Sequence, residues 1–314
     1  MMKQYAFGVD VGGTTCKIGF FETNGTILDK WEIKTNTENN GDSILSDIAQ
    51  AVDNKLAQEG ISKSDVQGIG IGVPGPVNGE GTVFRCVNLG WGVLNVAEAL
   101  GELTGLNVKV GNDANVAALG EAWKGGAAGS TDVVMVTLGT GVGGGIIVNG
   151  QMVTGHNGAG GEIGHITVSK SEIEPCNCGQ YGCLEQYASA TGIVRVARRK
   201  LAKSQEETVL RTNENLTAKD IFDAAKAGDD IAIQLVDEVC GILGGALSNI
   251  SAVVNPEVIV IGGGVSKAGS ILIENVQKHF IETSFHACRD TKFALAKLGN
   301  DAGMYGCVKM LLED

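Results

Sequence analysis

The chain has 314 residues, a length that favours two packed domains over a single core. Its formal net charge of -12 argues against a nucleic-acid-binding protein, and its longest basic run, Arg198-Arg199-Lys200, indicates a solvated helix face. Eight cysteines spread over a chain this long do not indicate a secreted disulfide scaffold, and no uninterrupted apolar run is long enough to span a bilayer. We therefore expect a cytoplasmic protein without a nucleic-acid or membrane partner.

The first part of the chain alternates strand and helix patterns. Short apolar runs separated by the turns Gly12-Gly13 and Asn24-Gly25 predict an antiparallel meander at the N-terminus. Longer segments with apolar residues three and four positions apart predict helices between the later strands. The predicted strands are 5–10, 15–21, 27–34, 66–73 and 108–111, and the predicted helices are 43–59, 95–104 and 112–123. This alternation is typical of an α/β protein.

The second part begins by repeating the pattern of the first. Strand 133–138, the glycine loop 139–144 and strand 145–148 again give an apolar strand, a Gly/Thr turn and a returning strand, which indicates an internal duplication. The remaining predicted elements are helices 184–201, 218–227, 231–254, 269–285 and 302–312 and strands 258–261 and 293–297. We expect a hinge near 114–129, with one α/β domain over 1–118 joined by the C-terminal helix 301–314, and a larger one over 119–300.

Three thiols and an imidazole are concentrated in one segment. Cys176, Cys178 and Cys183 follow His165 and are separated by turn glycines. Three thiolates and one imidazole form the closed tetrahedral ligand set of structural zinc, whereas the alternative is three buried, unligated thiols. Glu162 and Glu185 flank these ligands, so a zinc site would hold both carboxylates in a fixed geometry, as at a substrate site.

Three glycine-rich turns could bind a nucleotide. Backbone N–H groups of the turns 10–15 and 139–141 can form anion-binding nests, and Asp10 fits there if magnesium lies between it and a polyphosphate. The spacing Gly139-x-Gly141-x-x-Gly144 matches a dinucleotide fingerprint, but a strand follows it where that motif requires a helix, so we reject a dehydrogenase. The turn 262–264 follows a buried strand and could admit a nucleoside.

Asn112-Asp113 stands where a buried strand ends and a helix begins. Either residue could cap that helix. Alternatively, Asp113 could be a general base that accepts a proton from a substrate hydroxyl as its oxygen attacks phosphorus. The sequence pattern supports both roles equally.

Together these motifs resemble the ROK family of repressors, open reading frames and kinases, and most closely its bacterial glucokinases. The resemblance extends over nearly the whole chain, and the cysteine segment with its neighbouring EIGH is its most specific part. The matching motifs are DVGGTTCKIG at 10–19, GVPGPV at 72–77, NLGW at 88–91, GNDANVAALGE at 111–121, LGTGVGGGIIVNG at 138–150, GGEIGH at 160–165, CNCGQYGCLEQYAS at 176–189, IVIGGGVS at 259–266 and LGNDAGMYG at 298–306.

The resemblance implies an actin-like ATPase fold, also called ribonuclease H-like, in which two related α/β domains enclose a cleft for sugar and ATP. Asp113 would be the catalytic base for the sugar 6-hydroxyl. The substrate-binding residues would be Gly75, Asn88, Asn112, Asp113, Glu162, His165 and Glu185. His165 would serve both zinc and sugar, and the family suggests a homodimer or a larger homo-oligomer.

The resemblance also implies the residues that bind ATP and magnesium. Phosphates and Mg2+ would lie in the two glycine turns, and Gly263 and Gly264 would approach the adenosine. The full set is Asp10, Gly12, Gly13, Thr14, Thr15, Lys17, Gly139, Thr140, Gly141, Gly263 and Gly264.

Three functions are compatible with these motifs. Phosphorylation of glucose comes first, followed by phosphorylation of another hexose such as N-acetylmannosamine, mannose or fructose. A non-catalytic sugar-sensing regulator is the weakest, because the first strand begins at Tyr5 and leaves no room for a preceding DNA-binding module. A phosphate donor other than ATP also stays open.

Overall fold

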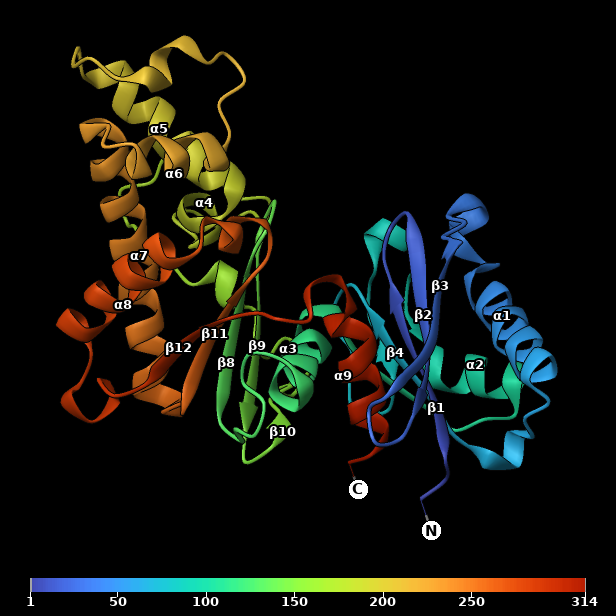
Figure 1. Ribbon diagram of the computed structural model, residues 1–314. Helices are drawn as coiled ribbons and strands as arrows, with labels where there is room; N and C mark the ends of the chain where they lie inside the picture. Colours follow the sequence, from blue (N-terminus) through green and yellow to red (C-terminus); the bar gives the residue numbers. More distant parts are fainter. Residues whose placement is uncertain (1, 314) are drawn as a thin grey trace. The chain divides into compact units, whose positions relative to one another are not determined.

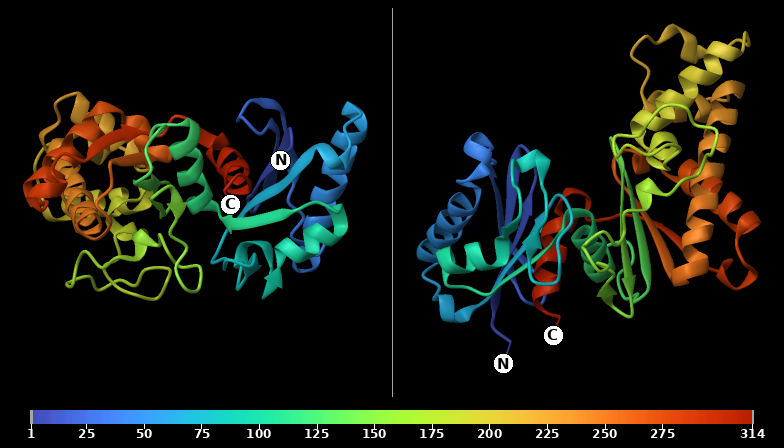
Figure 2. Two further views of the ribbon diagram at one scale, coloured as in Figure 1. Left: turned by 90° about the horizontal axis from the view of Figure 1, so that it is seen from below. Right: turned by 180° about the vertical axis from the view of Figure 1, so that it is seen from behind.

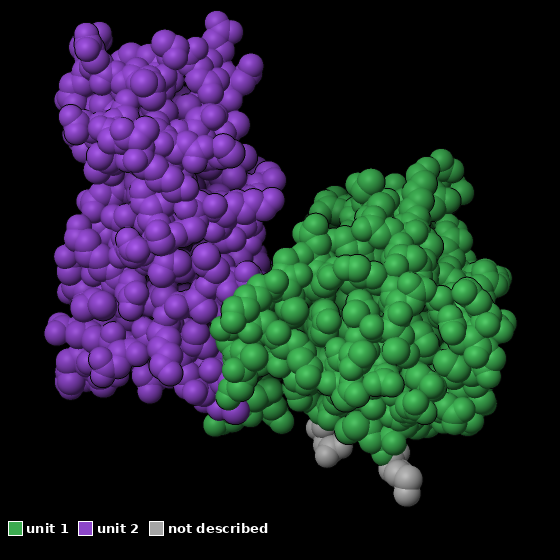
Figure 3. All heavy atoms as spheres, viewed as in Figure 1, with its two compact units in different colours: residues 1–129, 145–161, 297–314 green, residues 130–144, 162–296 purple. Residues whose placement is uncertain are grey.

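The computed structural model describes residues 2–313 and divides into two compact units (Figure 3). Unit 1 comprises Met1–Gly129, Gly145–Gly161 and Lys297–Asp314, and unit 2 comprises Ser130–Gly144 and Glu162–Ala296. The predicted domain ranges, 1–118 with 301–314 and 119–300, stay a prediction, because packing units do not test independent folding. The outermost residues of those ranges, Met1 and Asp314, lie outside the described residues.

The first sheet has five strands in the order β3-β2-β1-β4-β7 (Figure 1). Its antiparallel meander is β1 (Tyr5–Val11), β2 (Thr15–Glu22) and β3 (Ile27–Lys34). The strands β4 (Val66–Val73) and β7 (Val108–Asn112) extend it in parallel to β1. The central strands β1 and β4 are almost entirely buried, as strands covered on both faces must be.

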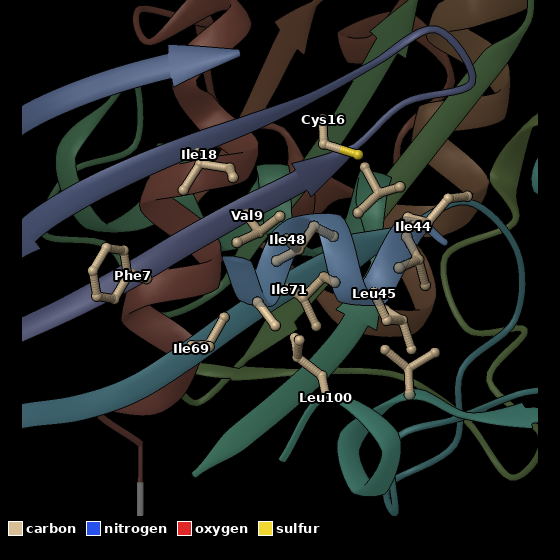
Figure 4. Packing of buried hydrophobic residues seen from close by; sticks show 14 of the residues in the cluster. Phe7, Val9, Cys16, Ile18, Ile44, Leu45, Ile48, Ile69, Ile71 and Leu100 are labelled. Carbon is tan, nitrogen blue, oxygen red and sulfur yellow. The ribbon is translucent and has the colours of Figure 1, made fainter. Parts of the chain in front are cut away.

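Helices cover both faces of this sheet. The helices α1 (Ile44–Glu59) and α2 (Val96–Thr104) border the larger core, where Phe7, Val9 and Ile71 meet Ile48 and Leu100 (Figure 4). On the other face lies α9 (Ala302–Leu311), the red helix beside the C label in Figure 2. Its Met304, Val308 and Leu311 pack with Ala6 and Phe21. Alternate residues of β1 therefore contribute to two different cores.

The helix α3 (Asp113–Lys124) packs closely against α9. A Cβ atom at Gly306 would lie only 1.6 Å from the carbonyl oxygen of Val116, so no larger residue fits at this helix crossing. This crossing brings the chain's last helix against the helix that starts at Asp113.

The second sheet repeats the strand order of the first. It has five strands in the order β10-β9-β8-β11-β12, where β11 is parallel to both β8 and β12. Their bounds are β8 (Val133–Leu138), β9 (Val142–Val148), β10 (Gln151–Met152), β11 (Val258–Gly262) and β12 (Lys292–Leu295). If the strands of each sheet are numbered by their order in the sequence, both sheets have the order 3-2-1-4-5. The predicted duplication requires this agreement.

Five helices belong to unit 2. They are α4 (Glu185–Ala188), α5 (Ala190–Lys203), α6 (Ala218–Lys226), α7 (Asp230–Val254) and α8 (Ser270–Thr283). By length and composition alone, α7 could cross a bilayer, but 61% of its most apolar stretch is buried inside the protein. Such burial is what a core helix of a soluble protein shows.

Most predicted elements are confirmed within a few residues, with the following differences. The strand β9 begins at Val142, so Val142, Gly143 and Gly144 are strand and not loop. The helix predicted over 184–201 is two helices, because the Ser189 hydroxyl accepts a hydrogen bond from Gly192 N and starts a new helix. The two-residue strands β5 (Thr82–Val83) and β6 (Leu94–Asn95) were not predicted.

Candidate active site

The carboxyl ends of three parallel strands bring the unit 1 candidates to one sheet edge. Asp10 of β1 pairs with Gly72 of β4, and Gly72 and Val73 of β4 pair with Gly111 and Asn112 of β7. In α/β sheets, ligands bind at this edge of parallel strands. The Asp10 turn and Asn112-Asp113 are therefore neighbours although about a hundred residues separate them in the sequence.

The β1–β2 hairpin carries Asp10 beside its turn and Gly13 and Thr14 exposed in the turn. Gly12 N donates to the carbonyl oxygen of Thr15 at 3.0 Å and closes the turn. Across the strands, Lys17 Nζ lies 3.9 Å from Asp10 Oδ2 and donates to Asn300 O at 3.5 Å. Burial raises the pKa of Asp10, and the Lys17 charge opposes this rise. A half-buried carboxylate of this kind fits a divalent cation, which would stabilise its charged form.

Asn112, not Asp113, caps α3. The Asn112 side-chain oxygen accepts hydrogen bonds from Ala114 N at 3.0 Å and Asn115 N at 3.1 Å. Its amide nitrogen donates to Gly75 O at 3.1 Å, which ties the end of β7 to the loop after β4. Asp113 follows as the first helical residue, and its Oδ1 accepts from Ala114 N at 2.8 Å. The capping alternative therefore applies to Asn112.

Gly75 and Asn88 lie in the loops that follow β4. Gly75 has a φ of 101°, a left-handed conformation that favours glycine. Asn88 is exposed on the short helix Val87–Leu89, which Leu89 anchors in the core. The structure thus places Gly75 against Asn112, whereas the role of Asn88 stays a prediction.

In unit 2, the Gly139–Gly141 turn joins β8 to β9 and is fixed by the start of α5. Gly139 N donates to Gly141 O at 3.0 Å, and Ala190 N donates to Gly139 O at 2.8 Å. The Thr191 hydroxyl donates to Thr140 O at 2.8 Å. These bonds hold the turn rigidly, as a phosphate-binding nest requires.

Glu185 links this turn to the cysteine cluster. Its Oε2 accepts from Val142 N at 3.1 Å, and its Oε1 accepts from Cys176 Sγ at 3.5 Å. A Cβ atom at Gly141 would lie 2.2 Å from Oε2, so the carboxylate needs glycine at that position. The sequence predicted Glu185 near the thiols but gave no signal for its contact with the glycine turn.

His165, Cys176, Cys178 and Cys183 converge as predicted. One ligand atom from each lies within 4.8 Å of all the others. Cys178 Sγ and Cys183 Sγ are 3.7 Å apart, too far for a disulfide but close to the edge of about 3.8 Å that two Zn–S bonds of about 2.3 Å make in a tetrahedron. Burial raises the pKa of the Cys183 thiol to about 12, a cost that a bound cation would offset by stabilising the thiolate. The donor set and its spacing fit zinc.

The two ring nitrogens of His165 face different partners. Nδ1 lies 4.0 Å from Cys176 Sγ, and Nε2 lies 4.0 Å from Glu162 Oε2. Both His165 and Glu162 are exposed. The geometry suits an imidazole with one nitrogen toward a metal and the other toward a ligand near Glu162.

Two adjoining pockets of unit 2 lie beside the nucleotide candidates. One, of about 290 Å³, is lined by Gly264, Val265 and Phe222. The other, of about 530 Å³, is lined by Thr140, Thr191 and Leu216, and both include Ala190. Gly263 has a φ of 82° and packs against the end of β8. The sequence did not predict that Phe222 and other residues of α6 line a pocket. Their apolar pattern indicated only a helix packed against the core.

A buried ion cluster fastens the cysteine segment to α5. The Glu172 side chain is 1% exposed and accepts from Arg199 Nη1 at 2.8 Å, Arg199 Nη2 at 2.9 Å and Tyr187 Oη at 2.8 Å. Arg195 Nη2 donates to the same carboxylate at 2.5 Å. Arg199 belongs to the basic run predicted to be a solvated face; the Arg199 side chain is 35% exposed, and its guanidinium is also paired with Glu172.

We expect Glu172→Gln to destabilise the fold by about 2 kcal/mol, because two partly buried guanidinium groups lose their buried carboxylate and keep only the exposed Glu174 as a partner. The guanidinium bonds hold the pKa of Glu172 well below its usual range. The stabilisation is therefore fully present above the ordinary glutamate pKa of about 4.3 and is lost as the pH falls below it. Urea unfolding at pH 7 and pH 3.5 measures this difference.

Glu174→Gln is the matched control, because the 56%-exposed Glu174 side chain pairs with the same arginines. Its expected effect is below about 0.5 kcal/mol. Equal effects of the two substitutions, or a Glu172 effect that does not shrink at low pH, would contradict the assignment.

The comparison with protein families decides the identity. The model of the ROK family matches residues 6–314. The chain belongs to the ROK family. Its two duplicated sheets are the two halves of the actin-like ATPase fold of ROK sugar kinases.

Individual ROK proteins are similar over nearly the whole of this chain. A glucokinase of Halalkalibacterium halodurans is 47% identical over 98% of this chain and 94% of its own. A ROK glucokinase from Streptomyces griseus, solved with glucose and AMPPNP, has a TM-score of 0.73 and 32% identity over 98% of both chains. A ROK transcriptional regulator homologous to the E. coli MLC protein has a TM-score of 0.85 and 27% identity, with 98% of this chain and 78% of the regulator covered.

Proposed function

We propose that this protein is a glucokinase that transfers the γ-phosphoryl group of ATP to the 6-hydroxyl of glucose. The identity of 47% to a glucokinase over 98% of the chain carries this assignment. A ROK glucokinase that binds glucose and an ATP analogue has the same fold at 32% identity. We favour glucose over other hexoses because both of these similar proteins are named glucokinases.

In unit 1, we assign the proton transfer to Asp113. Asp113 is the first residue of α3 and follows Asn112 at the sheet edge where ligands bind. It would accept the proton of the 6-hydroxyl while that oxygen attacks the γ-phosphorus and the bond to the β-phosphate oxygen breaks. Asn112, Gly75 and Asn88 would contact the same sugar.

Asp10 and its hairpin would hold Mg2+ and phosphate. The cation neutralises charge on the transferred phosphoryl group when bound. Asp10 supplies a half-buried carboxylate, and the turn that Gly12 N closes supplies the backbone N–H groups of Gly13, Thr14 and Thr15, with Lys17 as a nearby cation.

In unit 2, Glu162, His165 and Glu185 would bind the remaining sugar hydroxyls. Carboxylates accept two hydroxyl hydrogen bonds each, so such a site discriminates strongly against sugars that lack one hydroxyl. Glu185 also contacts the Gly139–Gly141 turn, which would receive phosphate. The pockets beside Gly264 and Thr140 are large enough for the adenosine part, and buried Phe222 offers an apolar wall.

The proposal includes a structural zinc held by His165, Cys176, Cys178 and Cys183. The closed donor set and the spacing of the sulfur atoms support it. This metal would fix the segment that carries Glu185 and orient His165. We further propose that the protein acts in glucose breakdown in the cytoplasm, where ATP is available. We also propose that it forms a homodimer.

The substrate preference follows from this assignment. Turnover with MgATP should give the highest kcat/KM for glucose when glucose, mannose, N-acetylmannosamine and fructose are compared by ADP release against a blank without sugar. A deoxy sugar that lacks one bound hydroxyl should lose about 10³-fold or more in kcat/KM. A higher kcat/KM for another hexose would replace glucose as the substrate, and turnover equal to the blank with all sugars would reject the kinase.

A further inference from the structure

Glu121 is a fully buried carboxylate near the end of α3, with no exposed surface. It accepts hydrogen bonds from three backbone N–H groups: Gly126 N at 2.6 Å, Leu298 N at 2.8 Å, and Lys297 N at 3.0 and 3.1 Å to its two oxygens. A buried carboxylate is costly unless such donors compensate for lost water. Its partners 126 and 297–298 are far apart in the sequence, so the side chain joins two separate segments.

Both segments are places where the chain passes between units. The chain leaves unit 1 after Gly129 and re-enters it at Lys297. Glu121 therefore binds both the segment by which the chain leaves unit 1 and the segment by which it re-enters unit 1. The bonded residues of both segments belong to unit 1, as α3 does.

The other two passages also contact α3. The chain re-enters unit 1 at Gly145 and leaves it after Gly161. A Cβ atom at Gly145 would lie 2.5 Å from Ala118 Cβ, and the Asn115 amide donates to Gly160 O at 3.2 Å. All four passages thus meet the helix whose first residue is Asp113.

We propose that Glu121 is a positioning residue for phosphoryl transfer: it fixes α3 against the segments that link the units and so sets the place of Asp113. This inference rests on the proposed function. Glu121 lies eight residues after Asp113, about 12 Å along a helix, so it acts on the base through the helix and not by contact with substrate. A shift of about 1 Å in a reacting group can cost about 10²-fold in rate.

The test compares Glu121→Gln with wild type. Glutamine has the same size, but its amide NH2 group is a donor and cannot accept hydrogen bonds from backbone N–H groups. The variant therefore loses part of the bonds that fix α3 to these segments. We expect kcat per folded molecule to fall about 10- to 100-fold, while KM for glucose changes less than about 3-fold. Hydrogen exchange, read by mass spectrometry, should become faster at Gly126, Lys297 and Leu298.

Two further variants keep the test decisive. Glu121→Asp retains the charge on a shorter side chain and should recover part of kcat, and it stands in if the glutamine variant does not fold. Glu257→Gln is the control, because Glu257 also accepts backbone N–H bonds, from Thr131 at 2.9 Å and Asp132 at 3.3 Å, but at the amino end of β11. Its kcat should match wild type.

A folded-molecule kcat within 2-fold of wild type for both Glu121 variants would overturn the proposal, even if their stability falls. If wild type itself does not phosphorylate glucose, the proposed function fails instead. The exchange at the three anchored amides then reports separately whether Glu121 fixes the linking segments, and unchanged exchange in the glutamine variant would also reject the anchor.

Discussion

Asp113→Asn is expected to lower kcat by about 10²- to 10⁴-fold, because an amide cannot accept the proton of the sugar hydroxyl. Folding and glucose binding should persist, since the N-cap bonds of α3 come from Asn112 and the substitution leaves them intact. Steady-state kinetics give kcat, titration calorimetry gives the Kd for glucose, and thermal unfolding gives the stability.

Asp230→Asn is the matched control for this change. Asp230 is the first residue of α7 and follows the N-cap Asp229, as Asp113 follows Asn112. The same chemical change at the same helix position should leave kcat within about 2-fold of wild type. Near-normal turnover of the Asp113 variant would reject the role of base, and a large loss of stability would indicate a structural role.

The second large effect is expected at the metal site. Purified protein should contain one zinc per chain, and Cys178→Ser should lose it together with several kcal/mol of stability, because metal binding contributes directly to folding. Cys178 is the exposed thiol of the cluster, so serine fits without steric conflict. Metal analysis by mass spectrometry and thermal unfolding measure the two quantities.

Cys288→Ala serves as the control for thiol loss. Cys288 is buried outside the cluster, so this variant can lose stability by packing alone but should keep its zinc. Zinc-free wild-type protein of full stability would contradict the metal site, as would an unchanged zinc content in the Cys178 variant.

Much of the fold could be predicted because its signals are local. Apolar runs that end at glycine turns predict β1, β2 and β8 within a residue or two, and the Asn149-Gly150 turn predicts the hairpin of β9 and β10. The cysteine cluster was also predictable, since its ligand types and spacing define its chemistry. The ambiguity at Asn112-Asp113 required coordinates, because both side chains can cap a helix.

The remaining features depend on partners that the sequence does not identify. Glu121 binds backbone N–H groups, one of which lies 176 residues away, and a backbone group leaves no residue-type signal. Glu172 resembles a surface glutamate until α5 brings Arg195 and Arg199 to it. Glu185 reaches the Gly139–Gly141 turn only after the chain folds, so the sequence indicated a functional carboxylate but not its contact.

The most direct test of glucose phosphorylation is to identify the product of wild-type protein with glucose and MgATP. We expect glucose 6-phosphate, formed in equal amount to ADP and detected by phosphorus NMR with the ester on the sixth carbon. ADP without a phosphorylated sugar, or a phosphate ester at another hydroxyl, would contradict it.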